Sequence, residues 1–139
     1  RKSAFANIMA LTQRHPYYVN VLCRHLWHEK TPPSEKKVAE AWRRYVQHER
    51  GRVITDINKL SNNQRELLVL IANNPTDRPY AEQYLSQTSF ARGSARGVLK
   101  ILLEQDYVVC DEEGVYRLQD PVIETYIRQK HQGSTLILL

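Results

Sequence analysis

Basic side chains recur at helical spacing in the C-terminal half of this 139-residue chain. Arg92, Arg96 and Lys100 are spaced i, i+4 and i+8, so on one helix they would share a face opposite the apolar residues around Val98. Arginines on such a face, with the hydroxyl of Ser94, could bind DNA phosphates and read guanine in the major groove. The spacing indicates a candidate nucleic-acid-binding helix, and the alternative interpretation is a solvated helix face.

Acidic residues near this helix argue against DNA. Asp111, Glu112 and Glu113 follow one another in a predicted turn. Residues 53–139 carry 9 Lys and Arg against 11 Asp and Glu, whereas residues 1–52 carry 11 against 4. Because affinity for duplex DNA depends largely on neutralising phosphates, we expect the C-terminal half to bind DNA weakly. The N-terminal basic residues indicate a solvated face or a contact for an anionic partner, and they include Lys36, Lys37, Arg43, Arg44, Arg50 and Arg52.

The sequence gives little support for a metal site or a catalytic site. Cys23, His25 and His28 lie close in sequence, but residues two apart on a helix point in different directions and no further zinc ligand follows at the usual spacing. The other histidines lack a neighbouring Ser, Cys or carboxylate pattern for acid-base catalysis. No Gly-x-x-x-x-Gly-Lys-Ser/Thr phosphate loop occurs. We therefore predict no metal site, no cofactor and no enzymatic activity in this chain.

The apolar runs and the cysteines indicate the cellular compartment of the protein. No run approaches the roughly 18 apolar residues that span a bilayer, and the first residues lack a secretory signal. Cys23 and Cys110 are far apart in the sequence, so we interpret each as a small buried hydrophobe. These features predict a cytoplasmic protein without membrane contact.

The N-terminal half reads as three helices. One ends near Gln13, one begins at Pro16, and one runs from the N-cap Ser34 to Gly51. Their predicted core faces are Ala4, Phe5, Ile8, Met9 and Leu11; Tyr18, Val19, Leu22, Cys23, Leu26 and Trp27; and Val38, Ala41, Trp42, Tyr45 and Val46. We predict a helical bundle over residues 1–52 and a connector over 53–60.

The C-terminal half reads as three helices, a hairpin and a last helix. Ser61 caps the first helix, Pro79 opens a short second helix, and the third follows a turn that ends at Gly93. Two β-rich runs, 107–110 and 115–118, then flank a turn, and residues from 120 onward form the last helix, which ends at Gly133. This order predicts a winged helix-turn-helix domain over 61–131, with a two-stranded wing and an apolar tail over 132–139.

Three stretches together resemble a known family. They are the segment His15-Pro16-Tyr17-Tyr18 with Leu22-Cys23 and Leu26-Trp27; Leu60-Ser61 with Asn63-Gln64-Arg65 and Leu67-Leu68; and 94–108 with Tyr116-Arg117 and Asp120-Pro121. Their order is similar to the C-terminal part of prokaryotic AAA-superfamily ATPases of the STAND-like kind. In that family a helical lid is followed by a winged helix.

The resemblance implies a mainly α chain and a non-catalytic role. Pro16, with His15 beside it, would lie near the adenine of a nucleotide bound by the parent protein, although Arg14 stands where the family usually has glycine. The resemblance implies ATP and magnesium in the full-length parent. We expect such a parent because the chain lacks an initial Met and starts within a helical pattern, as a C-terminal piece would. The expected partners are the upstream nucleotide-binding domain and another protein. The predicted function is a regulatory module that couples nucleotide state to output, and the alternative is a DNA-binding transcription regulator.

Overall fold

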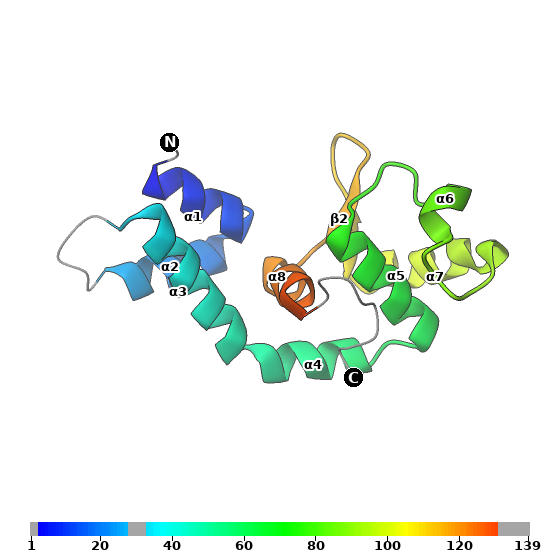
Figure 1. Cartoon of the computed structure of the whole chain (residues 1–139), viewed down its shortest axis with the longest axis horizontal. Helices are drawn as coiled ribbons and strands as arrows, with labels where there is room; N and C mark the ends of the chain where they lie inside the picture. Colours follow the sequence, from blue (N-terminus) through cyan, green and yellow to red (C-terminus); the bar gives the residue numbers. More distant parts are fainter. Residues whose placement is uncertain (1–2, 28–32, 131–139) are drawn as a thin grey trace. The chain divides into compact units, whose positions relative to one another are not determined.

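The computed structural model describes residues 3–27 and 33–130. The chain divides into two compact units, residues 1–50 and residues 51–139, called here the N-terminal unit and the C-terminal unit. Within the described residues the fold is mainly α, with eight α-helices and a two-stranded antiparallel hairpin near the C-terminus (Figure 1). None of these helices is long and apolar enough to cross a membrane.

Three helices that all contact one another form the N-terminal unit: α1 (Ala4–Thr12), α2 (Pro16–Leu26) and α3 (Glu35–His48) (Figure 1). The Ser34 hydroxyl accepts the N–H of Lys37 and so caps α3, as predicted. Pro16 is the first residue of α2, where its missing N–H costs no hydrogen bond. Trp42 is 1% exposed and lies at the centre of the core.

The buried face of α1 differs from the prediction. Phe5 is 67% exposed, whereas Asn7, Ile8 and Thr12 are buried. The Thr12 hydroxyl donates to the Ile8 carbonyl oxygen at 2.6 Å, and this bond lets a polar side chain enter the core. The apolar stripe of α1 is therefore rotated from the one that the sequence indicates.

The cysteines and Trp27 also correct the prediction. Cys23 and Cys110 are both exposed, so neither is a buried hydrophobe. Trp27, the C-cap of α2, is 84% exposed. The buried residues of α2 are Tyr18, Val21, Leu22 and Leu26, so its buried face includes Val21 and excludes Cys23 and Trp27.

The C-terminal unit surrounds α5 (Asn62–Asn73). Ser61 and Gln64 form a reciprocal capping box at its start. This helix contacts α7 (Ala95–Glu104), α8 (Pro121–Lys130) and strand β2 (Tyr116–Leu118) (Figure 1). Residues 67–72 are all buried, because neighbours cover α5 on several sides.

The remaining elements are α4 (Arg50–Asn58), α6 (Glu82–Leu85) and the 3-10 turn η1 (Arg92–Ser94). The predicted connector 53–60 is mostly within α4. The short second helix begins at Glu82 rather than at Pro79, which lies buried in the preceding turn.

Strands β1 (Val108–Cys110) and β2 (Tyr116–Leu118) pair antiparallel with Val108 opposite Leu118. Thr76, between α5 and α6, adds an antiparallel bridge to Tyr116, with N–H to carbonyl distances of 3.2 and 2.7 Å. The hairpin is thereby tied to the helices. The predicted helix end at Gly133 and the apolar tail lie outside the described residues.

Candidate functional site

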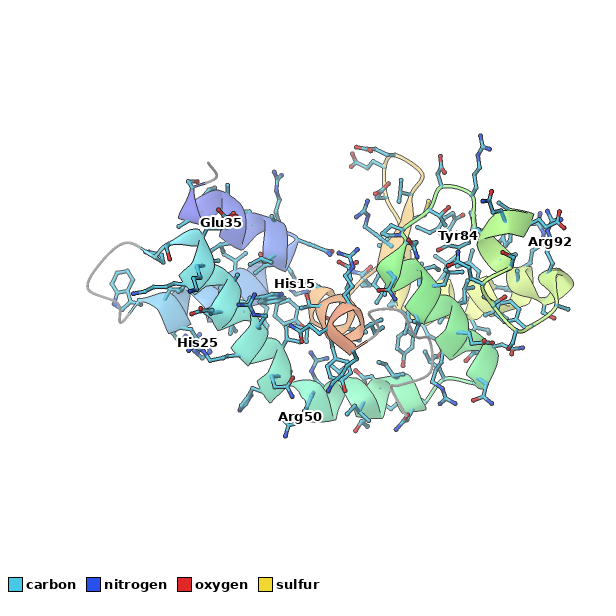
Figure 2. All side chains as sticks on the ribbon, viewed as in Figure 1. His15, His25, Glu35, Arg50, Tyr84 and Arg92 are labelled. Carbon is cyan, nitrogen blue, oxygen red and sulfur yellow. The ribbon has the colours of Figure 1, made fainter. Side chains whose placement is uncertain are left out.

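Two of the predicted nucleic-acid-binding residues gather around an aromatic ring. The Arg96 guanidinium carbon lies 4.5 Å from the ring centroid of Tyr80, which is a cation–π contact. The Arg92 Nε donates to the Tyr80 carbonyl oxygen at 3.1 Å. We call these three residues the Tyr80 cluster; both of its arginines are exposed, and Arg92 precedes α7 (Figure 2).

The turn before α7 sets the geometry of this cluster. Arg92 and Ser94 belong to the 3-10 turn η1, and α7 begins only at Ala95. A 3-10 turn has about 3.0 residues per turn, so the i, i+4 register of an α-helix does not extend back to Arg92. Arg92 therefore lies in the turn before α7, and only Arg96 and Lys100 are four residues apart within that helix.

Lys100 and Ser94 lie apart from the Tyr80 contacts. The Lys100 Nζ is 3.8 Å from the Glu104 Oε1, and both side chains are exposed. Such surface pairs contribute little to stability, but each places a carboxylate next to the cation. Ser94 is exposed and makes no side-chain cap for α7.

Tyr80 is the site residue that the sequence reasoning missed. It is held in a segment that Tyr84 fixes, since the Tyr84 hydroxyl donates to the Asn74 carbonyl oxygen at 2.7 Å. Burial raises the pKa of Tyr84, so this phenol stays a neutral donor. Tyr80 is twelve residues before Arg92, and no local spacing pattern pairs them.

The three acidic residues of the turn between the strands have different roles. One is hydrogen-bonded within the turn, and the other two are exposed to solvent. The Asp111 Oδ1 accepts the N–H groups of Val115 and Glu113, and its Oδ2 accepts from the Arg117 Nε at 2.8 Å. The Val115 bond, together with the Arg117 and Glu113 bonds, lowers the pKa of Asp111. Glu112 and Glu113 remain the exposed acids of this tip.

The residues predicted to lie near adenine are at the start of α2. His15 and Pro16 are exposed, and the His15 ring centroid is 4.8 Å from that of Tyr18. Arg14 has a φ of 62°, in the left-handed region that favours glycine. The backbone here adopts the conformation that a glycine would allow, although the residue is an arginine.

The cysteine and histidines that were considered as metal ligands lie on or next to α2 in the sequence. Cys23 and His25 are exposed on α2, and His28 lies outside the described residues. Among residues 3–27 and 33–130, no group of three or more His, Cys, Asp or Glu side chains is arranged to hold a metal ion. Comparisons with known protein families, curated proteins and solved structures find no match for this chain.

Proposed function

We propose that this chain is a non-catalytic regulatory and interaction module of a larger, ATP-binding AAA-superfamily ATPase. In this proposal the N-terminal unit is the helical lid, and the C-terminal unit couples nucleotide state to output through protein contacts. The sequence resemblance supports both assignments. The three-helix bundle and the later helix–hairpin order are consistent with it.

We further propose that residues 61–131 form a winged helix-turn-helix domain with β1 and β2 as the wing. The order α5, α6, α7, β1, β2 supports this assignment. The bridge between Thr76 and Tyr116 also supports it, because it ties the turn end of the hairpin to the segment that follows α5.

The charged side chains of α7 and of the wing tip favour a protein partner over DNA. A DNA reader uses arginine to neutralise phosphate or to bind guanine. Here both arginines contact Tyr80, Lys100 pairs with Glu104, and the wing tip presents Glu112 and Glu113. Carboxylates at the tip repel phosphate, whereas a mixed-charge surface suits a complementary protein.

A nucleotide titration of the full chain tests its non-catalytic role. Because the sequence lacks a phosphate loop, calorimetry with magnesium and ATP should show no binding tighter than about 1 mM. Clear submillimolar affinity would contradict the proposal. The coding sequence upstream of Arg1 gives a second test, since it should encode a phosphate loop and its absence would refute an ATPase parent.

DNA binding is the second candidate function. The observation in its favour is that Arg92, Ser94 and Arg96 are all exposed where α7 begins. A guanidinium that stacks on tyrosine keeps its outward N–H groups, so such an arginine can still donate to a phosphate. In that case binding would be strongly salt-dependent.

A further inference from the structure

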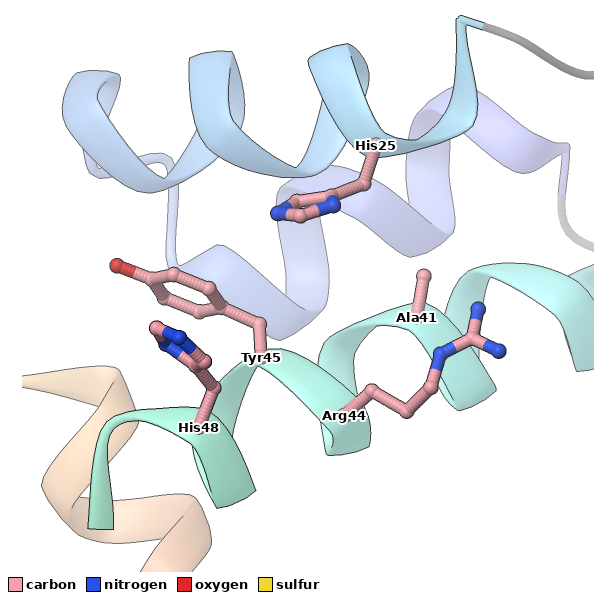
Figure 3. A pocket seen from close by; sticks show the side chains of 5 residues that line it. All are labelled: His25, Ala41, Arg44, Tyr45 and His48. Atoms are coloured by element: carbon pink, nitrogen blue, oxygen red, sulfur yellow. The ribbon is translucent and has the colours of Figure 1, made fainter.

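A pocket of about 400 Å³ opens on the N-terminal unit between α2 and α3. His25 from α2 and Ala41, Arg44, Tyr45 and His48 from α3 line it (Figure 3). Figure 3 shows the His25 ring above Ala41, with Tyr45 and Arg44 extending to opposite sides of the space below. Ala41 is small and buried, and it forms part of the pocket lining.

The Tyr45 wall is fixed by an aromatic cluster behind it. The Tyr45 ring centroid lies 6.0 Å from those of both Tyr18 and Trp42, and 6.1 Å from that of His25. The Tyr45 hydroxyl is 3.4 Å from the Glu49 Oε1. Burial, with the nearby Glu49 carboxylate, raises the pKa of Tyr45, so the phenol stays neutral. The ring is therefore a preorganised apolar surface.

The polar groups around the Tyr45 ring are mainly hydrogen-bond donors. Arg44 supplies a guanidinium fork, and His25 and His48 each supply at least one imidazole N–H. Among the described residues, no carboxylate lines the pocket, although the Glu49 Oε2 is 3.8 Å from the His48 Nδ1 at its edge. The lining thus combines carbon walls with hydrogen-bond donors and a permanent positive charge.

We propose that this pocket binds a phosphate group attached to an aromatic ring. The ligand ring packs against Tyr45 and His25, as offset aromatic pairs do. Its phosphate oxygens accept from Arg44, whose fork matches phosphate geometry, and from the histidines. An inorganic anion alone would leave the mostly carbon-lined pocket unfilled, and a neutral ring would leave the donors unused.

The probe for this proposal is phenyl phosphate, titrated into the uniformly ¹⁵N-labelled full chain and followed by NMR. We expect saturable shifts at Tyr45 and its neighbours with a dissociation constant of about 1 mM or tighter. Inorganic phosphate, benzoate and benzyl alcohol should each bind at least about tenfold more weakly. Failure to saturate below about 10 mM phenyl phosphate, or equal binding of any comparison compound, would overturn the proposal.

A pair of adjacent arginines provides the matched variants. Arg44→Gln should weaken phenyl phosphate binding by about tenfold, because a charge-assisted hydrogen bond is lost. Arg43→Gln removes the same charge from an exposed position of α3 that does not line the pocket, so it should leave the affinity nearly unchanged. Both residues are exposed, and circular dichroism checks that the helices remain. Equal weakening by the two variants would show general attraction to a basic surface and refute the site.

Discussion

The two units of the molecule bury their apolar side chains to different degrees. Among the described residues, the large hydrophobic side chains with strong exposure are Phe5, Tyr17 and Trp27, and all three belong to the N-terminal unit. In the C-terminal unit α5 is covered by two helices and a strand. A unit of only three helices has too little neighbouring surface to cover every apolar residue. The C-terminal unit is therefore the more self-contained of the two.

The largest expected effect comes from the two tryptophans, both of which lie in the N-terminal unit. Trp42→Ala should cost about 3–5 kcal/mol, because it empties the core position of a residue that is 1% exposed. We expect the N-terminal unit to lose its cooperative transition in urea, as measured by the NMR signals of α2 and α3. Trp27→Ala is the control and should cost less than about 0.5 kcal/mol. Similar losses in the two variants would mean that the burial assigned to one of these tryptophans is wrong.

Two glycines of the C-terminal unit, one in a turn and one in a helix, should respond oppositely to replacement by alanine. Gly114 has a φ of 82° in the hairpin turn, so Gly114→Ala should destabilise the chain by about 1 kcal/mol. Gly97 lies in α7 with an ordinary φ and no atom within 4 Å of an added Cβ. Gly97→Ala should therefore raise stability by up to about 1 kcal/mol. Urea unfolding followed by circular dichroism measures both, and a loss at Gly97 would contradict the exposed helix face.

A smaller effect is expected at Arg14 in the N-terminal unit. Arg14→Gly relieves the left-handed conformation but adds flexibility to the unfolded chain, so we expect a net gain of about 0.5 kcal/mol. The same change at Arg43, within α3, should cost about 1 kcal/mol. The difference in sign is the test, since loss of stability in both variants would show that the φ of Arg14 carries no strain.

The turn between β1 and β2 should give the smallest effect, and that effect depends on pH. The folded chain lowers the pKa of Asp111, so its carboxylate stabilises the hairpin above the ordinary aspartate pKa of about 4. That stabilisation is lost as the pH falls through the lowered value. Asp111→Asn should therefore melt below the wild type at pH 7, and the gap should narrow below about pH 4. A gap that stays constant with pH would mean that the charge of Asp111 contributes nothing.

The positions of the helices and strands could be predicted from the sequence better than the side of each helix that is buried. Ser34 and Ser61 were identified as caps because a cap is a local hydrogen bond between residues three apart. The hairpin was found because its turn glycine and β-branched flanks are adjacent in the chain. The buried sides of α1 and α2 were mispredicted at Phe5 and Trp27, since rotation about a helix axis depends on tertiary neighbours.

The site residues show the same division. Arg92 and Arg96 were predicted as one stripe, but the 3-10 turn before Ala95 could not be read from helical periodicity. Their contacts with Tyr80 depend on a loop that returns from α6 to α7. Likewise, His25 and Arg44 share a pocket only because α2 packs on α3.

The most direct test of the regulatory assignment is the affinity of the full chain for duplex DNA, measured by fluorescence anisotropy with a labelled 20-base-pair duplex. We predict no binding tighter than about 100 μM at 150 mM salt, because the hairpin turn is acidic and the C-terminal unit carries no basic excess. Arg96→Glu and the control Lys130→Glu, which makes the same charge change at the exposed end of α8, should then behave alike. Micromolar binding that Arg96→Glu abolishes and Lys130→Glu retains would contradict the account and establish a DNA-binding domain.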